Sequence, residues 1–532
     1  MKSDRLPPGI PYIIGNEAAE RFSYYGMRAI LFVYMVALYL DFVPKDQAGP
    51  DLVADAEVRA TKVAHLFFAG VYFFPMVGAI LADRLFGKYP VIFWVSLVYC
   101  AGHAMLALSG KYTWGMYTGL TLIAIASGGI KPCVSANVGD QFTAANSHLV
   151  TKVYQIFYFS INFGSFFSQL LIPWIYKHYG PEVAFGVPGI LMGSATLIFW
   201  LGRNKFVRLP PKPGGWLGLL DFFASTFLFL FFAVFVFAFL FELDMALAVQ
   251  LAIAAGSLAL WLLLFTLRQR IQPDAGFLSV LFYAIGNQRR RKPGMGFFDV
   301  AREKFSAEAA EGPPAVLRIM IVFSMVSVFW ALFDQHASTW IKQSEAMDLT
   351  MGLGSWQIEV TAPQIQSLNP FFVMLIIPFL NIAVYRPLAK RGIVIKPLRR
   401  MTAGMFITSL SFVAAALVQV WIESLPGEKI HVAWQVIQYL LLTVGEVLVS
   451  ITGLEFAYTQ APRAMKSTIM GFWLLTVTIG NLLVVALAPL QKLSLSSFFW
   501  TFAVLMAVAA AIFSVMAFFY KEKTYLQEAR GQ

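Results

Sequence analysis

The sequence predicts an all-α, polytopic membrane protein. Of its 532 residues, 58% are hydrophobic, 16% are aromatic and only 13% are charged, and the mean hydropathy is +0.68. This composition is typical of chains whose helices lie in lipid. Apolar runs long enough to cross a bilayer recur along the whole chain, and the basic residues gather between alternate runs. No polar tract is long enough to form a large water-soluble domain.

The apolar runs predict fourteen membrane-spanning helices, because about 20 consecutive apolar residues cross the hydrocarbon core. Their approximate ranges are 11–40, 61–86, 89–109, 112–136, 151–176, 184–202, 216–241, 245–268, 316–343, 364–386, 397–421, 431–460, 465–490 and 496–520.

The basic residues predict the orientation of these spans. When the spans are threaded with the N-terminus in the cytoplasm, most of the 40 lysines and arginines fall on the cytoplasmic side. The net charge of +11 is therefore interpreted as an orientation signal and not as a nucleic-acid-binding surface. Cys100 and Cys133 both lie in apolar runs, so a disulfide framework is not expected. The short polar segment 1–10 predicts no cleaved signal peptide.

The chain divides into three predicted units. Residues 1–205 and 316–532 each hold six spans, and the second unit ends in a short cytoplasmic tail. Residues 206–315 contribute two additional spans and a basic cytoplasmic linker. The first additional span, 216–241, is interpreted as free of buried charge, so this pair is assigned no transport chemistry. The polybasic run 289–292 fits either anionic lipid headgroups or a plain solvated linker.

The first span carries an unusual polar stripe. At about 100° per residue, Glu17, Glu20, Arg21, Tyr24 and Arg28 fall within a sector of roughly 100°. A charge at mid-membrane costs from about 2.5–3.5 kcal/mol upward, so the stripe is predicted to face a wet or protein-lined interior. The alternative is a chance amphipathic helix or a structural ladder of ion pairs.

Three sequence patterns together resemble one family of transporters. The pattern Glu-x-x-Glu-Arg-Phe-x-Tyr-Tyr-Gly at 17–26 and the pattern Phe-Tyr-x-x-Ile-Asn-x-Gly-Ser at 157–165 resemble the signatures of the proton-dependent oligopeptide transporters, bacterial type. Residues 78–88, with Asp83 and Arg84, resemble the cytoplasmic gate loop of the major facilitator superfamily. The resemblance implies a major facilitator fold, with two six-helix bundles and two extra central helices.

Ionisable residues are distributed unevenly between the two halves. The first half supplies Arg28 and Lys131, whereas the second supplies Asp334 and Glu446. Opposite charges that face each other across a bundle can pair in one state and separate in another. A zwitterionic peptide has a carboxylate for the basic side and an ammonium for the acidic side.

The resemblance implies specific binding roles. Arg28 and Lys131 would bind the peptide carboxylate, and Glu446 would bind the amino terminus together with two asparagines. Aromatic residues would form the side-chain pockets, because they offer contact area with few polar handles. The predicted binding residues are Tyr25, Arg28, Tyr72, Lys131, Tyr158, Asn162, Trp330, Asn369, Glu446 and Trp473.

Proton coupling is predicted to use breakable ion pairs. Protonation of a buried carboxylate would release its bridge to Arg21 or Lys131, and Lys131 is predicted to be the hub between the first-span acids and Glu446. His65 could take up the incoming proton, since its unperturbed pKa is near 6.5, or make an interhelical hydrogen bond. The predicted coupling residues are Glu17, Glu20, Arg21, His65, Lys131, Asp334 and Glu446.

The sequence and the resemblance together predict a symporter that imports di- and tripeptides with protons across the cytoplasmic membrane. Both termini are expected in the cytoplasm, the protein is expected to act as a monomer among membrane lipids, and no cofactor, metal or nucleic acid is expected. The alternative is the same fold with another cargo, such as an amino acid, an organic anion or a drug-like molecule. A channel would need a pore-lining repeat, and an enzyme would need a nucleophile-base pair or metal ligands; neither pattern is evident.

Overall fold

The structure is a computed structural model that describes residues 5–41, 49–143, 146–240, 245–353, 356–393, 395–460, 465–492 and 494–520. The predicted cytoplasmic tail beyond residue 520 lies outside the described residues.

The first half of the chain forms a helical bundle, the N-lobe. Its elements are α1 (Ile10–Asp41), α2 (Pro50–Ile80), which continues as the π-helical turn η1 (Leu81–Phe86), α3 (Lys88–Ser109), α4 (Thr113–Asp140), the short turn η2 (Ser147–Leu149) and α5 (Val150–Leu201). A middle segment follows, with α6 (Gly215–Leu240), α7 (Leu247–Ile271), α8 (Phe277–Gly286), η3 (Gln288–Arg290) and η4 (Asp299–Glu303).

The second half forms a second bundle, the C-lobe, in which several spans are built from consecutive pieces. These are α9 (Ala307–Phe333), η5 (Asp334–Ala337), α10 (Thr339–Glu345), η6 (Ala362–Ser367), α11 (Leu368–Phe379), η7 (Leu380–Tyr385), α12 (Arg386–Lys390), α13 (Pro397–Ser424), η8 (Val432–Trp434), α14 (Gln435–Glu446), η9 (Val447–Ile451), α15 (Thr452–Gln460), α16 (Lys466–Leu487), η11 (Ala488–Lys492) and α17 (Leu495–Phe519). A small antiparallel hairpin, β1 (Thr350–Leu353) and β2 (Trp356–Glu359), pairs Thr350 with Glu359.

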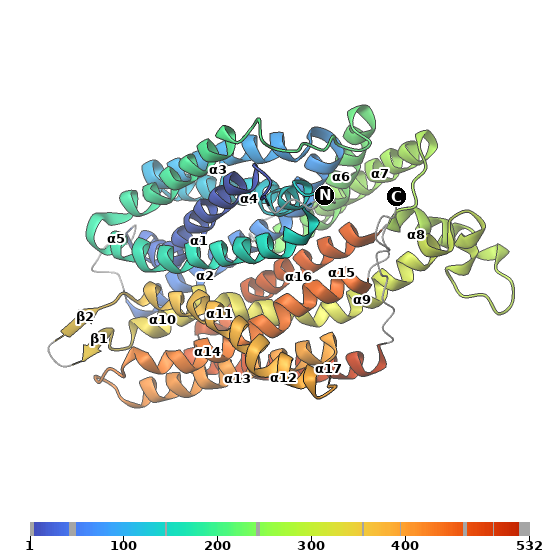
Figure 1. Ribbon diagram of the computed structural model, residues 1–532. Coiled ribbons are helices and arrows are strands. Elements are labelled where there is room, and N and C mark those ends of the chain that lie inside the picture. The colour runs from blue at the N-terminus through green and yellow to red at the C-terminus, as the bar shows by residue number, and fades with distance from the viewer. Residues whose placement is uncertain are drawn as a thin grey trace.

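The two lobes lie side by side with their helices roughly along one common direction (Figure 1). The β1–β2 hairpin marks one end of the molecule, called the outer end below, and α8 marks the opposite, inner end. Helix α16 of the C-lobe packs against α2 of the N-lobe, and α11 packs against α5. The additional helices α6 and α7 pack against each other, and α6 also contacts α2 and η1.

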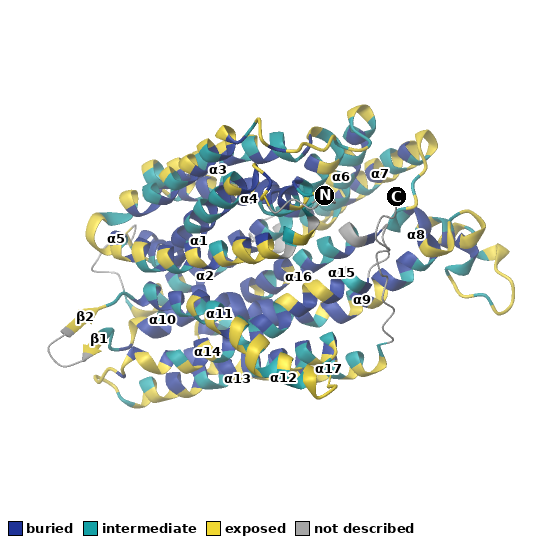
Figure 2. Cartoon of the chain, in the orientation of Figure 1, coloured by how far each residue is buried: buried dark blue, intermediate teal, exposed yellow. Residues whose placement is uncertain are grey.

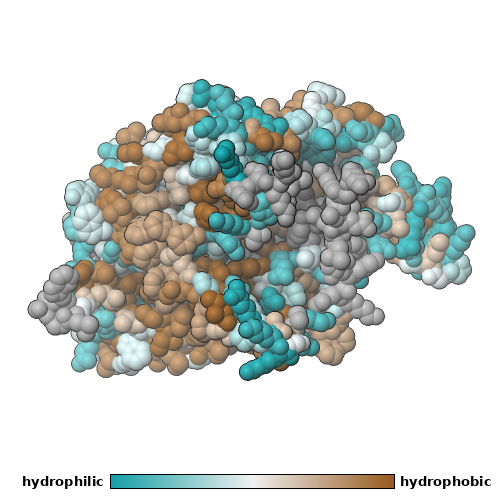
Figure 3. All heavy atoms as spheres, in the orientation of Figure 1, coloured by the Kyte–Doolittle hydropathy of each residue, from teal (hydrophilic) through white to brown (hydrophobic). Residues whose placement is uncertain are grey.

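The prediction of an all-α membrane protein is confirmed, apart from the small hairpin. Within the described residues, 13 helices are long and apolar enough to cross a membrane. Helix α5 breaks at Gly180, whose φ of 83° lies in the left-handed region that favours glycine, so this one element supplies two spans. The fourteen predicted spans are thereby accounted for. Hydrophobic side chains cover much of the surface between the two ends, and hydrophilic ones gather around α8 (Figure 3).

Two helices begin earlier than the hydropathy predicts. Helix α2 begins at Pro50 and not near residue 61, because its first turns are polar and extend beyond the apolar part. Helix α9 begins at Ala307, inside the segment predicted to be a linker. The Ser306 hydroxyl accepts a hydrogen bond from the Ala309 amide at 3.3 Å and thus caps this helix.

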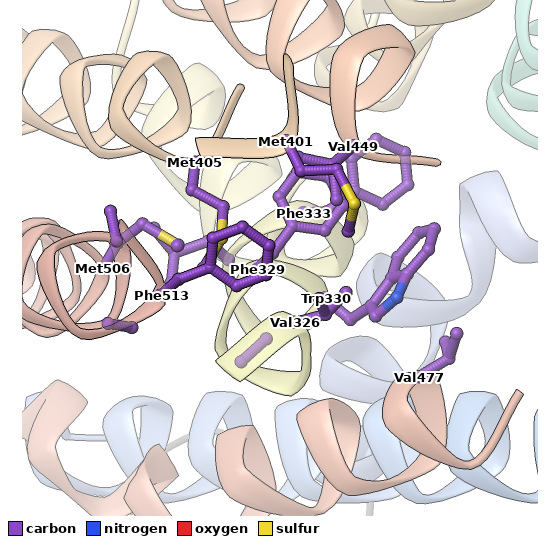
Figure 4. Close-up of a cluster of buried hydrophobic side chains, with 14 of the residues drawn as sticks. Val326, Phe329, Trp330, Phe333, Met401, Met405, Val449, Val477, Met506 and Phe513 are labelled. Carbon is purple, nitrogen blue, oxygen red and sulfur yellow. The ribbon is translucent and has the colours of Figure 1, made fainter. Parts of the chain in front are cut away.

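Each lobe has its own hydrophobic core, and buried residues line the facing sides of its helices (Figure 2). In the C-lobe, Val326, Phe329 and Phe333 of α9 pack toward Met405 of α13 and Met506 of α17 (Figure 4). Such packing holds α9 in place, and α9 carries Trp330 and ends at Phe333, directly before Asp334.

Close backbone contact positions α4 within the N-lobe. A Cβ atom on Gly78 of α2 would lie 2.1 Å from the carbonyl oxygen of Gly128 of α4, so a larger residue cannot be accommodated without separating the two helices. Lys131 lies one turn beyond Gly128 and is brought close to α2 by this contact.

Replacing Trp340 with alanine is expected to destabilise the C-lobe. Trp340 is fully buried and packs on Phe412 and Tyr439 at ring-centroid distances of 5.5 and 4.9 Å. Truncating a buried aromatic side chain costs about 3–5 kcal/mol. Thermal unfolding of the detergent-solubilised protein should show a clear fall in Tm, whereas Trp500→Ala, at a position 39% exposed in α17, should leave the Tm nearly unchanged. Equal Tm values for the two variants would contradict this role of Trp340.

Candidate functional site

The first-span acids share a single cation. The Arg21 Nε atom lies 2.7 Å from the Glu17 Oε1 atom and 2.9 Å from the Glu20 Oε2 atom, and all three side chains are buried. The spacing explains the first pair, because residues four apart face each other on a helix. Two carboxylates around one guanidinium leave one excess negative charge, which a proton can neutralise.

Lys131 lies next to this triad but does not form an ion pair with it. Its ammonium lies 4.4 Å from the centre of the Tyr24 ring and 4.2 Å from that of Tyr72, and it makes no hydrogen bond with any residue that the structure describes. Arg21 and Arg28 repel its charge, whereas Glu20 and Asp334 attract it. The Lys131 ammonium thus lies between two tyrosine rings, and its predicted role as the hub between the first-span acids and Glu446 stays a prediction.

The two lobes are joined by a buried ion pair. The Arg28 Nη2 atom lies 2.6 Å from the Asp334 Oδ1 atom, and the side chains are only 3% and 2% exposed. The second oxygen of Asp334 accepts a hydrogen bond from the Asn481 Nδ2 atom at 2.7 Å. Arg28 and Asp334 therefore form one of the pairs of opposite charge that the distribution of ionisable residues between the two halves allows. Asn481, to which the sequence analysis gave no role, holds the carboxylate in place.

His65 extends the same network across the lobe interface. Since Asn481 uses its amide nitrogen to bind Asp334, its oxygen is the acceptor for the His65 Nδ1–H group at 2.8 Å. The His65 Nε2 atom then accepts from the Ser338 hydroxyl at 2.9 Å when the imidazole is neutral. The interhelical hydrogen bond that the sequence analysis weighed for His65 is thus present. The sequence signal that could have identified Asn481 is a lone asparagine within an otherwise apolar span.

Further bonds join the lobes near the outer end. The Gln366 Nε2 atom donates to the carbonyl of Ala29 at 3.1 Å, and the Gln364 Nε2 atom donates to that of Leu170 at 2.8 Å. Lys342 of α10 pairs with Glu57 of α2. Together with the Arg28–Asp334 pair, these contacts close the outer end of the lobe interface.

The second-half acid Glu446 lies in a separate polar cluster. Its Oε2 atom accepts a hydrogen bond from the Asn369 Nδ2 atom at 2.7 Å, and the same amide nitrogen lies 3.2 Å from the Thr443 hydroxyl. Glu446 is partly exposed and stands at the end of α14, where the π-helical turn η9 begins. The structure therefore brings together two of the residues assigned to the peptide amino terminus.

The predicted aromatic residues divide into exposed and buried groups. Tyr158 is 38% exposed, and its carbonyl accepts a hydrogen bond from the Asn162 Nδ2 atom at 3.0 Å, so one donor of Asn162 is already used within α5. Tyr25 packs edge-on against Tyr24 at 5.2 Å.

Trp330 and Trp473 are, by contrast, only 8% and 3% exposed, and their ring centres are 6.2 Å apart. Both belong to the C-lobe core, in which Figure 4 shows Trp330, so their role as pocket walls stays a prediction.

The gate loop forms the π-helical turn η1 at the inner end of α2. The Arg84 Nη1 atom lies 3.4 Å from the Asp221 Oδ2 atom of α6. The Asp83 carbonyl oxygen accepts a hydrogen bond from the Lys212 amide at 2.8 Å. The first additional span is interpreted above as free of buried charge. That interpretation was wrong, because Asp221 lies in α6 with its side chain only 17% exposed.

Comparisons with known proteins agree with this architecture. The family model PTR2, described as the POT family, matches residues 89–238 and 295–498. Solute carrier family 15 member 2 of Rattus norvegicus is 25% identical over 730 residues, which cover 97% of this chain and 90% of the relative.

Two solved structures are more similar in sequence. The POT family transporter PepTSo is 38% identical, with a TM-score of 0.76 and coverage of 96% of this chain and 98% of that one. A structure described as an auto-inhibited POT family peptide transporter is 37% identical, with a TM-score of 0.77 and coverage of 98% and 99%.

Proposed function

Because this chain belongs to the POT family, we propose that it imports di- and tripeptides together with protons across the cytoplasmic membrane by alternating access. The single observation that carries the proposal is the buried pair between Arg28 of the N-lobe and Asp334 of the C-lobe, 2.6 Å apart. A charge pair that spans the lobe interface can hold the outer end closed and must separate when that end opens.

The arrangement of charges suits a zwitterionic peptide. Arg28 and Lys131 stand on the N-lobe side, and Glu446 stands on the C-lobe side with Asn369. We assign the peptide carboxylate to the two cations and the peptide ammonium to Glu446. Tyr25, Tyr72, Tyr158, Asn162, Trp330 and Trp473 complete the proposed binding site.

Proton binding is assigned to the carboxylates. A proton on Glu20 or Glu17 would weaken its bond to Arg21, and a proton on Asp334 would release Arg28. His65 contacts Asp334 through Asn481 and is the proposed entry point from the outer end. Asp83 and Arg84 are assigned to the inner gate. One proton that moves through 100 mV supplies about 2.3 kcal/mol, which corresponds to roughly fifty-fold accumulation of a neutral peptide.

The location, orientation and oligomeric state of the protein complete the proposal. The chain is a multi-pass membrane protein. We propose that it lies in the cytoplasmic membrane with both termini in the cytoplasm, and that it works as a monomer without a cofactor. Its relatives are transporters and not enzymes.

Uptake by reconstituted protein tests the proposal. Proteoliposomes should accumulate labelled dialanine when the outside is more acidic than the inside, and a protonophore that dissipates the gradient should abolish the accumulation. Liposomes without protein are the control. If neither di- nor trialanine is taken up in response to the gradient, while an amino acid or organic anion is, the alternative cargo is supported instead.

A further inference from the structure

An acidic residue of α6 links the additional helices α6 and α7 to the gate loop. Asp221 of α6 lies between two arginines: its Oδ1 atom is 2.8 Å from the Arg268 Nε atom of α7, and its Oδ2 atom is 3.4 Å from the Arg84 Nη1 atom of the gate loop. The side chains of Asp221 and Arg268 are 17% and 6% exposed, whereas that of Arg84 is 43% exposed. The two less exposed side chains therefore belong to the helical hairpin formed by α6 and α7, called the α6–α7 hairpin below, and Arg84 is their more exposed partner.

Backbone contacts attach the same segment to the end of the gate loop. A helix leaves its last four carbonyl groups without intrahelical partners. Here the Lys212 amide donates to the Asp83 carbonyl at 2.8 Å, and the Gly214 amide donates to the Arg84 carbonyl at 3.1 Å. A Cβ atom on Gly218 would lie 2.0 Å from that Arg84 oxygen, so only glycine permits α6 to pack this closely. The chain before α6 thus caps the helix that carries the gate residues.

The α6–α7 hairpin contacts the N-lobe through α6. The ring of Phe229 in α6 packs edge-on against that of Phe73 in α2, at a centroid distance of 5.3 Å. Helix α7 contacts α6 and is joined to it by the Arg268–Asp221 pair. The Arg268 guanidinium also donates to the carbonyl of Gln272 at the end of α7. Movement of α7 is therefore transmitted to Asp221.

We propose that the α6–α7 hairpin braces the inner gate, with Asp221 as the positioning residue that orients Arg84. The brace would hold the gate loop in the geometry needed for the inner ends of the two lobes to approach each other. The proposal rests on the proposed transport cycle, because it assigns the hairpin a role in one of its steps. It gives the two additional helices a function without placing them in the peptide site.

The test measures the separation of the inner ends directly. Spin labels at positions 152 in the N-lobe and 399 in the C-lobe, both exposed, would report this distance in the full-length protein with Cys100 and Cys133 replaced. Samples in lipid nanodiscs at acidic and neutral pH, with and without dialanine, would show inner-open and inner-closed populations. The variants are Asp221→Asn, Arg84→Gln and the double variant, and Arg270→Gln is the matched control because Arg270 is exposed on the last turn of the same helix as Arg268.

The brace predicts a non-additive result. Arg84→Gln should lower the inner-closed population by about threefold, a shift expected for loss of a partly exposed ion pair. Asp221→Asn should lower this population at least as much, because it also removes the pair with Arg268. The double variant should match Asp221→Asn, since the Arg84–Asp221 contact is already lost once Asp221 is replaced. Arg270→Gln should behave as the parent. An Asp221→Asn protein with the parent's distances, or additive effects in the double variant, would overturn the proposal.

Two features keep this test informative. Arg84→Gln removes the contact from its exposed side, so it reports on the brace even if Asp221→Asn does not fold. The distance measurement does not depend on uptake. A parent protein that fails to import peptides yet shows the predicted variant shifts would refute the proposed function alone, whereas normal uptake without the shifts would refute the brace alone.

Discussion

Asp334→Asn is expected to abolish proton-driven peptide uptake and to open the outer end of the lobe interface. The substitution leaves the Arg28 guanidinium buried and without its carboxylate, while Asn481 loses its charged acceptor. Breaking a buried ion pair by removing one partner costs about 3–5 kcal/mol, which corresponds to a shift of about 10²- to 4 × 10³-fold against the outer-closed state.

Spin labels at the outer ends of the lobes and uptake of dialanine would measure the two effects. Asp299→Asn is a suitable control, because Asp299 forms an exposed pair with Arg302 at 3.4 Å. Exposed pairs contribute about 0–1 kcal/mol, so this variant should keep parental uptake and parental distances. An outer end that stays closed in Asp334→Asn would remove the Arg28–Asp334 pair from the mechanism.

Glu20→Gln is expected to separate transport from proton coupling. The carboxamide cannot bind and release a proton, and Arg21 keeps Glu17 as its remaining carboxylate. Gradient-driven accumulation should fall by about tenfold or more, since one coupled proton can support roughly fifty-fold accumulation. Counterflow, in which labelled peptide exchanges for unlabelled peptide without a gradient, should persist.

The matched control is Glu303→Gln. Glu303 lies on the inner surface, 3.9 Å from Arg290 with its side chain 43% exposed. This variant should retain both accumulation and counterflow. Loss of both activities in Glu20→Gln would indicate a structural role for the first-span acid, and retention of both would exclude it from coupling.

Much of the fold could be predicted from the sequence because lipid imposes a simple rule. A span must be long and apolar, and this rule located the fourteen spans. It could not locate the ends that leave the apolar region. The first turns of α2 after Pro50 are polar, and the start of α9 at Ala307 depends on a cap from Ser306. Nor does hydropathy signal the π-helical turn η9 beside Glu446, which depends on backbone geometry.

The candidate site was predictable where a charged residue in an apolar span carries a large free-energy cost unless it is paired. Arg28 and Asp334 are charges in apolar helices, and each therefore demands a partner. Which residues surround each charged side chain in three dimensions was harder to predict from the sequence. The sequence predicts Lys131 as a hub between carboxylates, but it carries no signal for the rings of Tyr24 and Tyr72 that flank the ammonium. Asp221 was overlooked within an otherwise apolar run.

The surroundings of Lys131 have a consequence for how it could exchange partners. Ring faces attract a cation without fixing the direction of its N–H groups, so the ammonium can rotate toward an arriving anion with no bond to break first. A guanidinium in the same place would stack flat on the tyrosines and lose that freedom. The two rings therefore stabilise the Lys131 ammonium away from lipid and leave its N–H groups free to bind a carboxylate that comes within reach.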